Sequence, residues 1–135
     1  MPYYVIERTI EVLNQHEKSL NGSKVLVLGV AYKKDIDDER ESPGYIIMKL
    51  LSEKGAIVSY NDPWIPVLKQ TRKYNFRKKS IPITQEVLQE MDAIIIITDH
   101  SAYDYAEIVK HSNLIIDTRN ATNKIDGADV KVYSA

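Results

Sequence analysis

The chain has 135 residues, of which 44% are hydrophobic and 27% are charged, and its net charge of −1 argues against bulk attraction to nucleic acid or to a membrane surface. This length supports a single domain with a real core, and the absence of cysteine excludes a disulfide scaffold, a thiolate metal site and a cysteine nucleophile within the chain. Because no run of about 18 apolar residues and no signal-peptide pattern occur, we expect a cytoplasmic protein that does not span a bilayer.

The first predicted element is a helix over residues 1–20. Its apolar residues, among them Val5 and Leu13, recur at spacings of three and four, and Pro2 suits a first helical turn. Two interpretations remain open for this helix, which precedes the first strand and has no strand partner before it. Either it packs on the sheet as an N-terminal helix, or it is the tail of a preceding domain or an oligomer contact.

A strand, a charged loop and a second helix are predicted next. Residues 24–30 form a nearly continuous apolar run rich in valine, which is typical of a strand buried on both faces. Seven of the eight residues from 34 to 41 are charged. Ser42 as N-cap and Pro43 as first helical residue then predict a helix that ends at Gly55. Such a strand, loop and helix form the place where open α/β sheets bind ligands.

The middle of the chain holds a second strand and a segment without a clear period. Residues 57–60 are expected to form the strand, and residues 61–63 break it. Residues 64–79 contain six lysines and arginines among aromatic side chains, and a short helix near residues 67–74 is conceivable. A solvated basic surface is the favoured interpretation, and a nucleic-acid patch would need more than one such run.

The second half alternates helices and strands. Thr84 is expected to cap a helix that runs to about residue 89, and four consecutive isoleucines within residues 93–98 indicate a central parallel strand. A helix over residues 103–110, a buried strand over residues 114–117 and a short last strand over residues 130–133 complete the pattern.

This order of elements predicts the fold class. Strands that alternate with helices form a parallel sheet with helices on both faces, joined by right-handed crossovers. We therefore expect a Rossmann-like three-layer α/β sandwich with a mainly parallel sheet, preceded by an N-terminal helix.

Cations follow the carboxyl ends of two predicted strands. Lys33 and Arg40 come after the first strand, and Arg119 comes after a later one. Because parallel strands end at one edge of a sheet, these side chains are expected to lie on one rim, where they would suit a phosphate or pyrophosphate. The alternative is that these are ordinary loop charges and that Arg40 pairs with Asp37 or Glu41.

Two kinds of site find no support in the sequence. No G-x-G-x-x-G follows any strand, and Gly29 stands alone where the dinucleotide fingerprint needs three glycines. The three histidines, His16, His100 and His111, lie far apart, so no metal site is expected. His100 follows the central strand, where it could donate or accept a hydrogen bond or support the turn.

Several segments together resemble the C-terminal, UDP-binding domain of the UDP-glucose/GDP-mannose dehydrogenase family. Residues 29–43 resemble its motif Gly-x-Ala-Tyr-Lys followed by Asp-x-Arg-x-Ser-Pro, and residues 60–63, 98–100 and 117–120 are similar to its later strand ends. Residues 1–22 resemble the end of its central helical domain. The Asp-Thr-Arg-Asn segment is closest in style to UDP-N-acetylglucosamine 6-dehydrogenases.

The resemblance implies a role for specific residues. Family members oxidise C6 of a nucleotide sugar to a carboxylate with two NAD⁺, and the C-terminal domain holds the UDP end. Carried over by motif, Tyr32, Lys33 and Arg119 would contact the nucleotide sugar, and Arg40 would face NAD⁺ across the cleft. Asp38 would orient the loop, and His100 would support the site.

The chain also departs from the family pattern. It lacks the glycine fingerprint of the family's NAD-binding domain and the catalytic cysteine. The resemblance therefore implies a helix over residues 1–21 from a missing central domain, a nucleotide-sugar-binding domain over residues 22–135, and no catalysis by this piece alone. The partners would be the missing domains and, in the full enzyme, further copies, in a role in polysaccharide biosynthesis. The alternatives are a stand-alone regulatory module that binds UDP-sugars or another nucleotide, or an interaction module.

Overall fold

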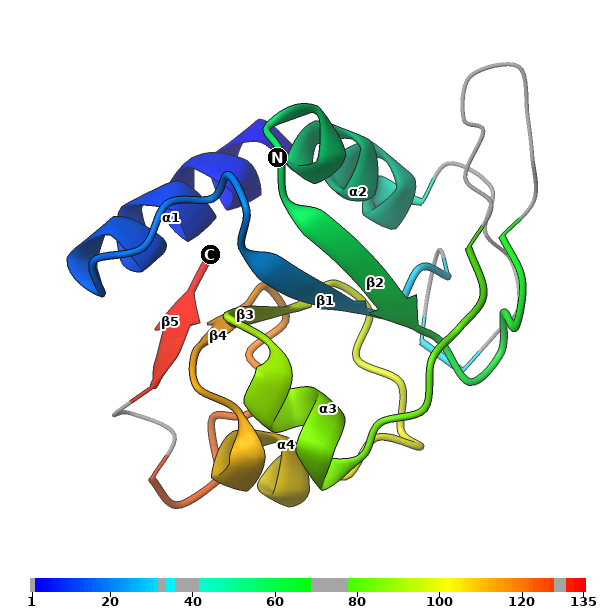
Figure 1. Ribbon diagram of the computed structural model, residues 1–135. Coiled ribbons are helices and arrows are strands. Elements are labelled where there is room, and N and C mark those ends of the chain that lie inside the picture. The colour runs from blue at the N-terminus through cyan, green and yellow to red at the C-terminus, as the bar shows by residue number, and fades with distance from the viewer. Residues whose placement is uncertain (1, 32–33, 36–41, 69–77, 128–130) are drawn as a thin grey trace.

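The computed structural model describes residues 2–31, 34–35, 42–68, 78–127 and 131–135, and it contains a sheet covered by helices on both faces (Figure 1). Helices α1 and α2 lie against one face, and α3 and α4 lie against the other. This arrangement confirms the predicted three-layer α/β sandwich. The helices are α1 (Pro2–Gln15), α2 (Pro43–Glu53), α3 (Gln85–Glu90) and α4 (Tyr105–His111).

The sheet has five strands in the order β2-β1-β3-β4-β5, and every pair of neighbouring strands is parallel. The Rossmann-like expectation is therefore correct, and the last strand joins the sheet in the same direction as the others. All carboxyl ends consequently lie at one edge. The strands are β1 (Lys24–Leu28), β2 (Ile57–Asn61), β3 (Ala93–Ile96), β4 (Ile115–Asp117) and β5 (Val132–Ser134).

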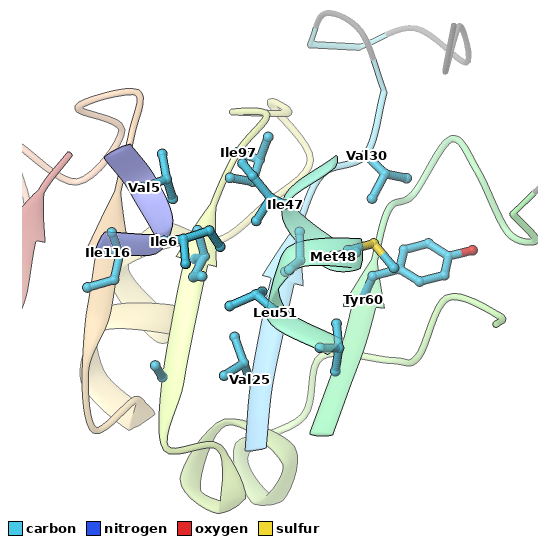
Figure 2. Close-up of a cluster of buried hydrophobic side chains, with 14 of the residues drawn as sticks. Val5, Ile6, Val25, Val30, Ile47, Met48, Leu51, Tyr60, Ile97 and Ile116 are labelled. Atoms are coloured by element: carbon cyan, nitrogen blue, oxygen red, sulfur yellow. The ribbon is translucent and has the colours of Figure 1, made fainter. Parts of the chain in front are cut away.

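The isoleucine run fills the core on both sides of the sheet. Ile94 and Ile96 pack with the residues of α3 and α4, whereas Ile95 and Ile97 pack with those of α1 and α2. Side chains alternate between the faces of a strand, so one uninterrupted apolar run serves both layers. Figure 2 shows the α1/α2 side, where side chains of both helices, among them Ile6 and Leu51, lie over the strands.

The first helix is shorter than predicted, because it ends at Gln15 rather than near residue 20. Glu17 adopts φ 62°, and the N–H groups of Glu17 and Lys18 donate to the carbonyls of Asn14 and Leu13. These two bonds form the helix-ending pattern in which glycine usually occupies the left-handed position. Glutamate there gave no sequence signal, which explains the overlong prediction.

Capping residues set the starts of the later helices. Ser42 accepts a hydrogen bond from the N–H of Gly44, and Thr84 accepts one from the N–H of Val87, as the sequence predicts. The fourth helix starts at Tyr105 instead of residue 103, because the Asp104 side chain accepts from the N–H of Glu107.

The basic middle segment is described only in part. Residues 69–77, which carry most of its charge, lie outside the described residues; of the short helix predicted near residues 67–74, only residues 67 and 68 are described, and neither is helical. Beside them, Val67 pairs with Lys79 in an isolated antiparallel bridge, and Lys78 donates to the carbonyl of Val58 on β2. The described flanks of the segment therefore pack along the edge strand.

Candidate functional site at the carboxyl edge of the sheet

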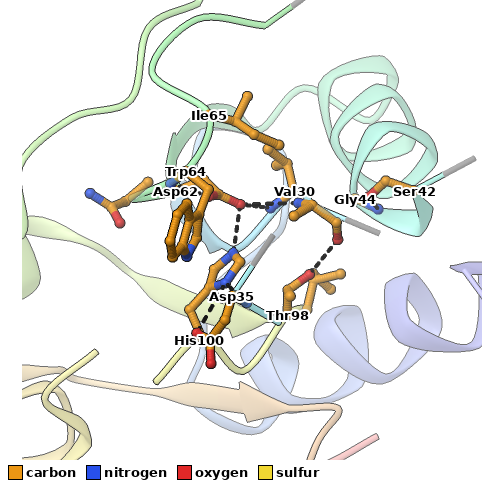
Figure 3. A network of polar contacts seen from close by, with 12 residues as sticks. Val30, Asp35, Ser42, Gly44, Asp62, Trp64, Ile65, Thr98 and His100 are labelled. Atoms are coloured by element: carbon orange, nitrogen blue, oxygen red, sulfur yellow. Dashed lines mark hydrogen bonds and ion pairs between the residues drawn. The ribbon is translucent and has the colours of Figure 1, made fainter. Parts of the chain in front are cut away.

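The carboxyl edge comprises the residues that directly follow four strands. Residues 29–31 follow β1, residues 62–64 follow β2, residues 97–101 follow β3, and residues 118–119 follow β4. Ligands of open α/β sheets bind outside this edge. The polar contacts that organise it are drawn in Figure 3.

Asp62 is the centre of the hydrogen-bond network at this edge. Its side chain is 1% exposed, and its Oδ2 accepts from the backbone N–H groups of Val30 at 2.8 Å and Ala31 at 3.0 Å. Its Oδ1 accepts from the N–H of Trp64 at 2.8 Å. One carboxylate thus ties the end of β1 to the end of β2, as the dashed lines of Figure 3 show.

His100 extends the network to the end of β3. Its ring is fully buried, and its Nδ1 accepts from the backbone N–H of Asp35 at 2.7 Å. Because a backbone N–H can only donate, the ring proton resides on Nε2, which lies 2.9 Å from Oδ2 of Asp62 and donates to it. His100 therefore uses both nitrogens and joins the loop after β1 to Asp62.

Asp35 receives a second set of contacts from the β3 end. Its carboxylate accepts from the N–H of Ser101 at 2.8 Å and from the Ser101 hydroxyl at 2.6 Å. These two hydrogen bonds hold the pKa of Asp35 below its ordinary value. Residue 35, five positions beyond Val30, is thus held by side chains that follow β3.

Gly29 allows the ends of β1 and β3 to approach each other closely. It adopts φ 87°, and a Cβ placed there would lie 2.5 Å from Cβ of Thr98 and 2.6 Å from its carbonyl oxygen. The Thr98 hydroxyl in turn donates to the carbonyl of Ala31 at 2.8 Å. A side chain at residue 29 would disrupt this contact.

The ionised form of Asp62 is favoured in the folded protein. Burial acts to raise its pKa, but hydrogen bonds from His100 and from the N–H groups of Val30 and Trp64 outweigh burial and lower the pKa below its usual value. The carboxylate therefore stabilises the fold above about pH 4, and this contribution is lost as the pH falls through the lowered native pKa.

This linkage predicts a difference between wild type and Asp62→Asn in acid. We expect the free energy of unfolding of wild type to fall more steeply below about pH 4 than that of Asp62→Asn, because the variant lacks the Asp62 carboxylate and its lowered pKa while it keeps every other acid. Urea unfolding at several pH values between about 3 and about 6 measures both slopes. Parallel curves would show that Asp62 does not contribute.

Arg119 lies on the carboxyl edge as the sequence predicts. Its side chain is exposed, and its Nε donates to the carbonyl of Ile97 at 2.9 Å, beside the end of β3. The turn before it is fixed by the buried Asp117, whose carboxylate accepts from the N–H of Arg119 and from both the N–H and the hydroxyl of Thr122. Among the described residues, no carboxylate forms an ion pair with the Arg119 guanidinium.

Four of the predicted site residues cannot be located in the same way. Tyr32, Lys33, Asp38 and Arg40 lie outside the described residues. Their roles stay predictions, and only His100 and Arg119 of the predicted set have a described geometry.

Sequence reasoning missed the central role of Asp62. From the sequence, residues 60–63 are a strand end followed by a break, with no role for Asp62, although an aspartate directly after a buried strand belongs to the ligand-binding edge of a parallel sheet. That position was the available signal. Its partners Val30 and His100 are 32 and 38 residues away, so no local pattern reveals them.

The described ranges also bear on metal binding and on membrane spans. Within the described ranges, no group of three histidine, aspartate or glutamate side chains lies close enough together to hold a metal ion. None of the helices described there has the length and hydropathy needed to cross a membrane.

Comparison with known proteins shows which family the chain resembles in sequence. The UDP binding domain of the UDP-glucose/GDP-mannose dehydrogenase family matches residues 26–124. The chain is 33% identical to the UDP-N-acetyl-D-mannosamine dehydrogenase of Methanococcus vannielii over 91% of its own length, and 28% identical to the UDP-N-acetyl-D-glucosamine 6-dehydrogenase of Salmonella typhi over 76%. It spans only 28% and 23% of these two relatives.

A solved structure agrees in fold. The NDP-N-acetyl-D-galactosaminuronic acid dehydrogenase of Methanosarcina mazei superposes with a TM-score of 0.76 at 28% identity, over 100% of this chain and 28% of that one. The similarity therefore covers the whole chain but less than a third of the larger protein.

Proposed function

Because the chain belongs to the UDP-glucose/GDP-mannose dehydrogenase family, whose UDP binding domain it matches, we propose that its carboxyl edge binds the UDP end of a nucleotide sugar. The observation that carries this proposal is the position of Arg119, an exposed guanidinium without a carboxylate partner among the described residues, at the ligand-binding edge of a parallel sheet. Guanidinium groups bind phosphate oxygens in a bidentate manner.

The environment of Arg119 supports a contact with an anion. Its Nε donates a hydrogen bond to the Ile97 carbonyl, which restrains the guanidinium, and the residue is exposed to solvent. Asp117 is buried and accepts from backbone and hydroxyl donors, and within the described part of the chain it forms no ion pair with the Arg119 guanidinium. Tyr32 and Lys33 are proposed to contact the same nucleotide sugar.

Replacing Arg119 by alanine is expected to weaken UDP binding about 10- to 100-fold, because charge-assisted hydrogen bonds to phosphate are lost. Isothermal titration of UDP into the chain measures the change. The matched control is Lys110→Ala, which removes an exposed cation from the last turn of α4, at the opposite edge of the sheet. Equal UDP affinity in wild type and Arg119→Ala would overturn the proposed site.

We also propose that this domain is one part of a larger, NAD-dependent enzyme. That enzyme would oxidise the C6 alcohol of a UDP-sugar to a carboxylate. The chain has no cysteine and no glycine-rich fingerprint, so the nucleophile and the main NAD site would come from other domains. NAD⁺ would accept hydride there, and Arg40 is proposed to face it while Asp38 orients the loop.

The proposal extends to assembly and pathway. Residues 1–21 are proposed to continue from a central helical domain, and residues 22–135 to form the nucleotide-sugar-binding domain. The larger protein is expected to be a homo-oligomer, and its uronic acid product would supply polysaccharide biosynthesis. The share of each relative that the chain spans, 28% for the first, supports a multidomain whole.

A further inference from the structure

Two buried side chains hold both ends of a short segment after β1. Asp62 accepts from the N–H groups of Val30 and Ala31, and His100 accepts from the N–H of Asp35. In sequence, Tyr32 lies between Ala31 and Asp35, as does Lys33. Asp62 and His100 are hydrogen-bonded to each other, with 2.9 Å between Oδ2 and Nε2. The contacts at Val30 and Ala31 and the contact at Asp35 are therefore linked through this pair (Figure 3).

We propose that Asp62 and His100 are positioning residues of the UDP site, which fix the backbone of Val30, Ala31 and Asp35, the described residues that flank Tyr32 and Lys33 in sequence. The inference rests on the proposed function, because it assigns the placement of a UDP-binding segment to a buried pair. Asp62 follows β2 and His100 follows β3, whereas the residues whose N–H groups they accept from follow β1.

Burial shows that the pair acts through the backbone rather than on a ligand. Asp62 is 1% exposed and His100 is 0% exposed, so neither side chain can reach a molecule bound outside the edge. Each polar atom of the pair is occupied by a donor or acceptor of the protein. In such a closed network every bond depends on the geometry of the next, so a change at one residue is transmitted to the segment.

The tautomer of His100 determines which ring nitrogen accepts from the N–H of Asp35 and which donates to Asp62. Nδ1 must be unprotonated to accept from Asp35, and Nε2 must then carry the proton given to Asp62. A hydrogen on Nδ1 would face the N–H of Asp35 and break that bond. The network therefore requires one tautomer of the imidazole.

Two substitutions at position 100 each keep one of the two hydrogen bonds of the imidazole and remove the other. Asparagine at position 100 offers an oxygen where Nδ1 accepts, and glutamine offers an N–H where Nε2 donates. The variants are thus His100→Asn and His100→Gln. The matched control is His111→Gln, since His111 also lies 2.9 Å from a carboxylate, that of Glu107, but on α4 and away from the edge.

UDP affinity and amide hydrogen exchange are measured on the full chain. We expect both His100 variants to bind UDP about tenfold more weakly than wild type, as for the loss of one buried hydrogen bond, and His111→Gln to bind like wild type. The amide of Asp35 should exchange faster in His100→Gln than in His100→Asn, because only asparagine still accepts from it. A purely structural role would lower stability without changing the affinity of the folded protein.

The outcomes separate this inference from the proposed function. If wild type binds UDP and Arg119→Ala weakens binding, but both His100 variants bind as wild type does, the positioning role is wrong and the UDP site stands. If wild type does not bind UDP, the proposed function is wrong and the positioning role falls with it. Unchanged exchange at Asp35 in both His100 variants would overturn the inference whatever the affinities are.

Discussion

Replacing Gly29 by alanine is expected to lower the free energy of unfolding by about 3 to 5 kcal/mol. Two penalties combine, because φ 87° is a strained conformation for an L-residue and the new Cβ would lie 2.5 Å from Cβ of Thr98. The carbonyl oxygen and nitrogen of Thr98 lie within 2.6 Å and 2.8 Å of the same position. Backbone at the buried carboxyl ends of β1 and β3 cannot move aside without a large cost.

Gly22 provides a matched control for the strain alone. It has the same φ of 87°, and a Cβ there would meet nothing within 4 Å. Gly22→Ala is therefore expected to cost only about 1 kcal/mol. Denaturant unfolding of both variants measures the difference, and equal losses would show that the contact with Thr98 is unimportant. A folded Gly29→Ala protein should also bind UDP weakly, since the segment it begins would shift.

Replacing Leu13 by alanine is the second change with a large expected effect. The side chain is fully buried in the same cluster as Val25 and Val27 of β1 and Ile116 of β4, so its loss removes apolar contacts and leaves a cavity. Large-to-small substitutions of buried leucine cost about 2 to 5 kcal/mol. We expect a loss in this range, because α1 packs beside α2 on one face of the sheet (Figure 1).

Ile10 lies on the same helix and serves as the control. It is 38% exposed, so Ile10→Ala is expected to cost less than about 1 kcal/mol. Thermal or urea unfolding of the two variants distinguishes two roles of α1. A large loss only in Leu13→Ala means that α1 is part of this core, whatever precedes it in a longer protein. Small losses in both would mean that α1 packs loosely on the sheet.

Local chemistry predicted most of the secondary structure. Ser42 with Pro43 starts α2, Thr84 starts α3, and the isoleucine run of residues 93–98 contains β3. These signals depend on residues within a few positions of each other, which is why the sequence reveals them. The end of α1 was missed, since Glu17 takes a conformation that glycine usually occupies.

The sequence predicted where Arg119 lies in the candidate site, whereas the hydrogen bonds of Asp62 and His100 became evident only in the structure. Strand direction and the position of Arg119 after a buried strand were sufficient to predict that it lies at the carboxyl edge. The support beneath this edge was not predictable, because Asp62 and His100 contact residues more than 30 positions away. Contacts of this kind exist only once β1, β2 and β3 are paired.

The amino-acid sequence alone therefore determined the alternation of helices and strands, the parallel sheet and the family, because periodicity, capping and motif spacing are local properties. The tertiary structure alone decided that Asp62 and His100 share one buried network, and that Gly29 must have no side chain. The physical reason is that hydrogen bonds and close packing depend on distance in space, which strand pairing sets between segments far apart in the chain.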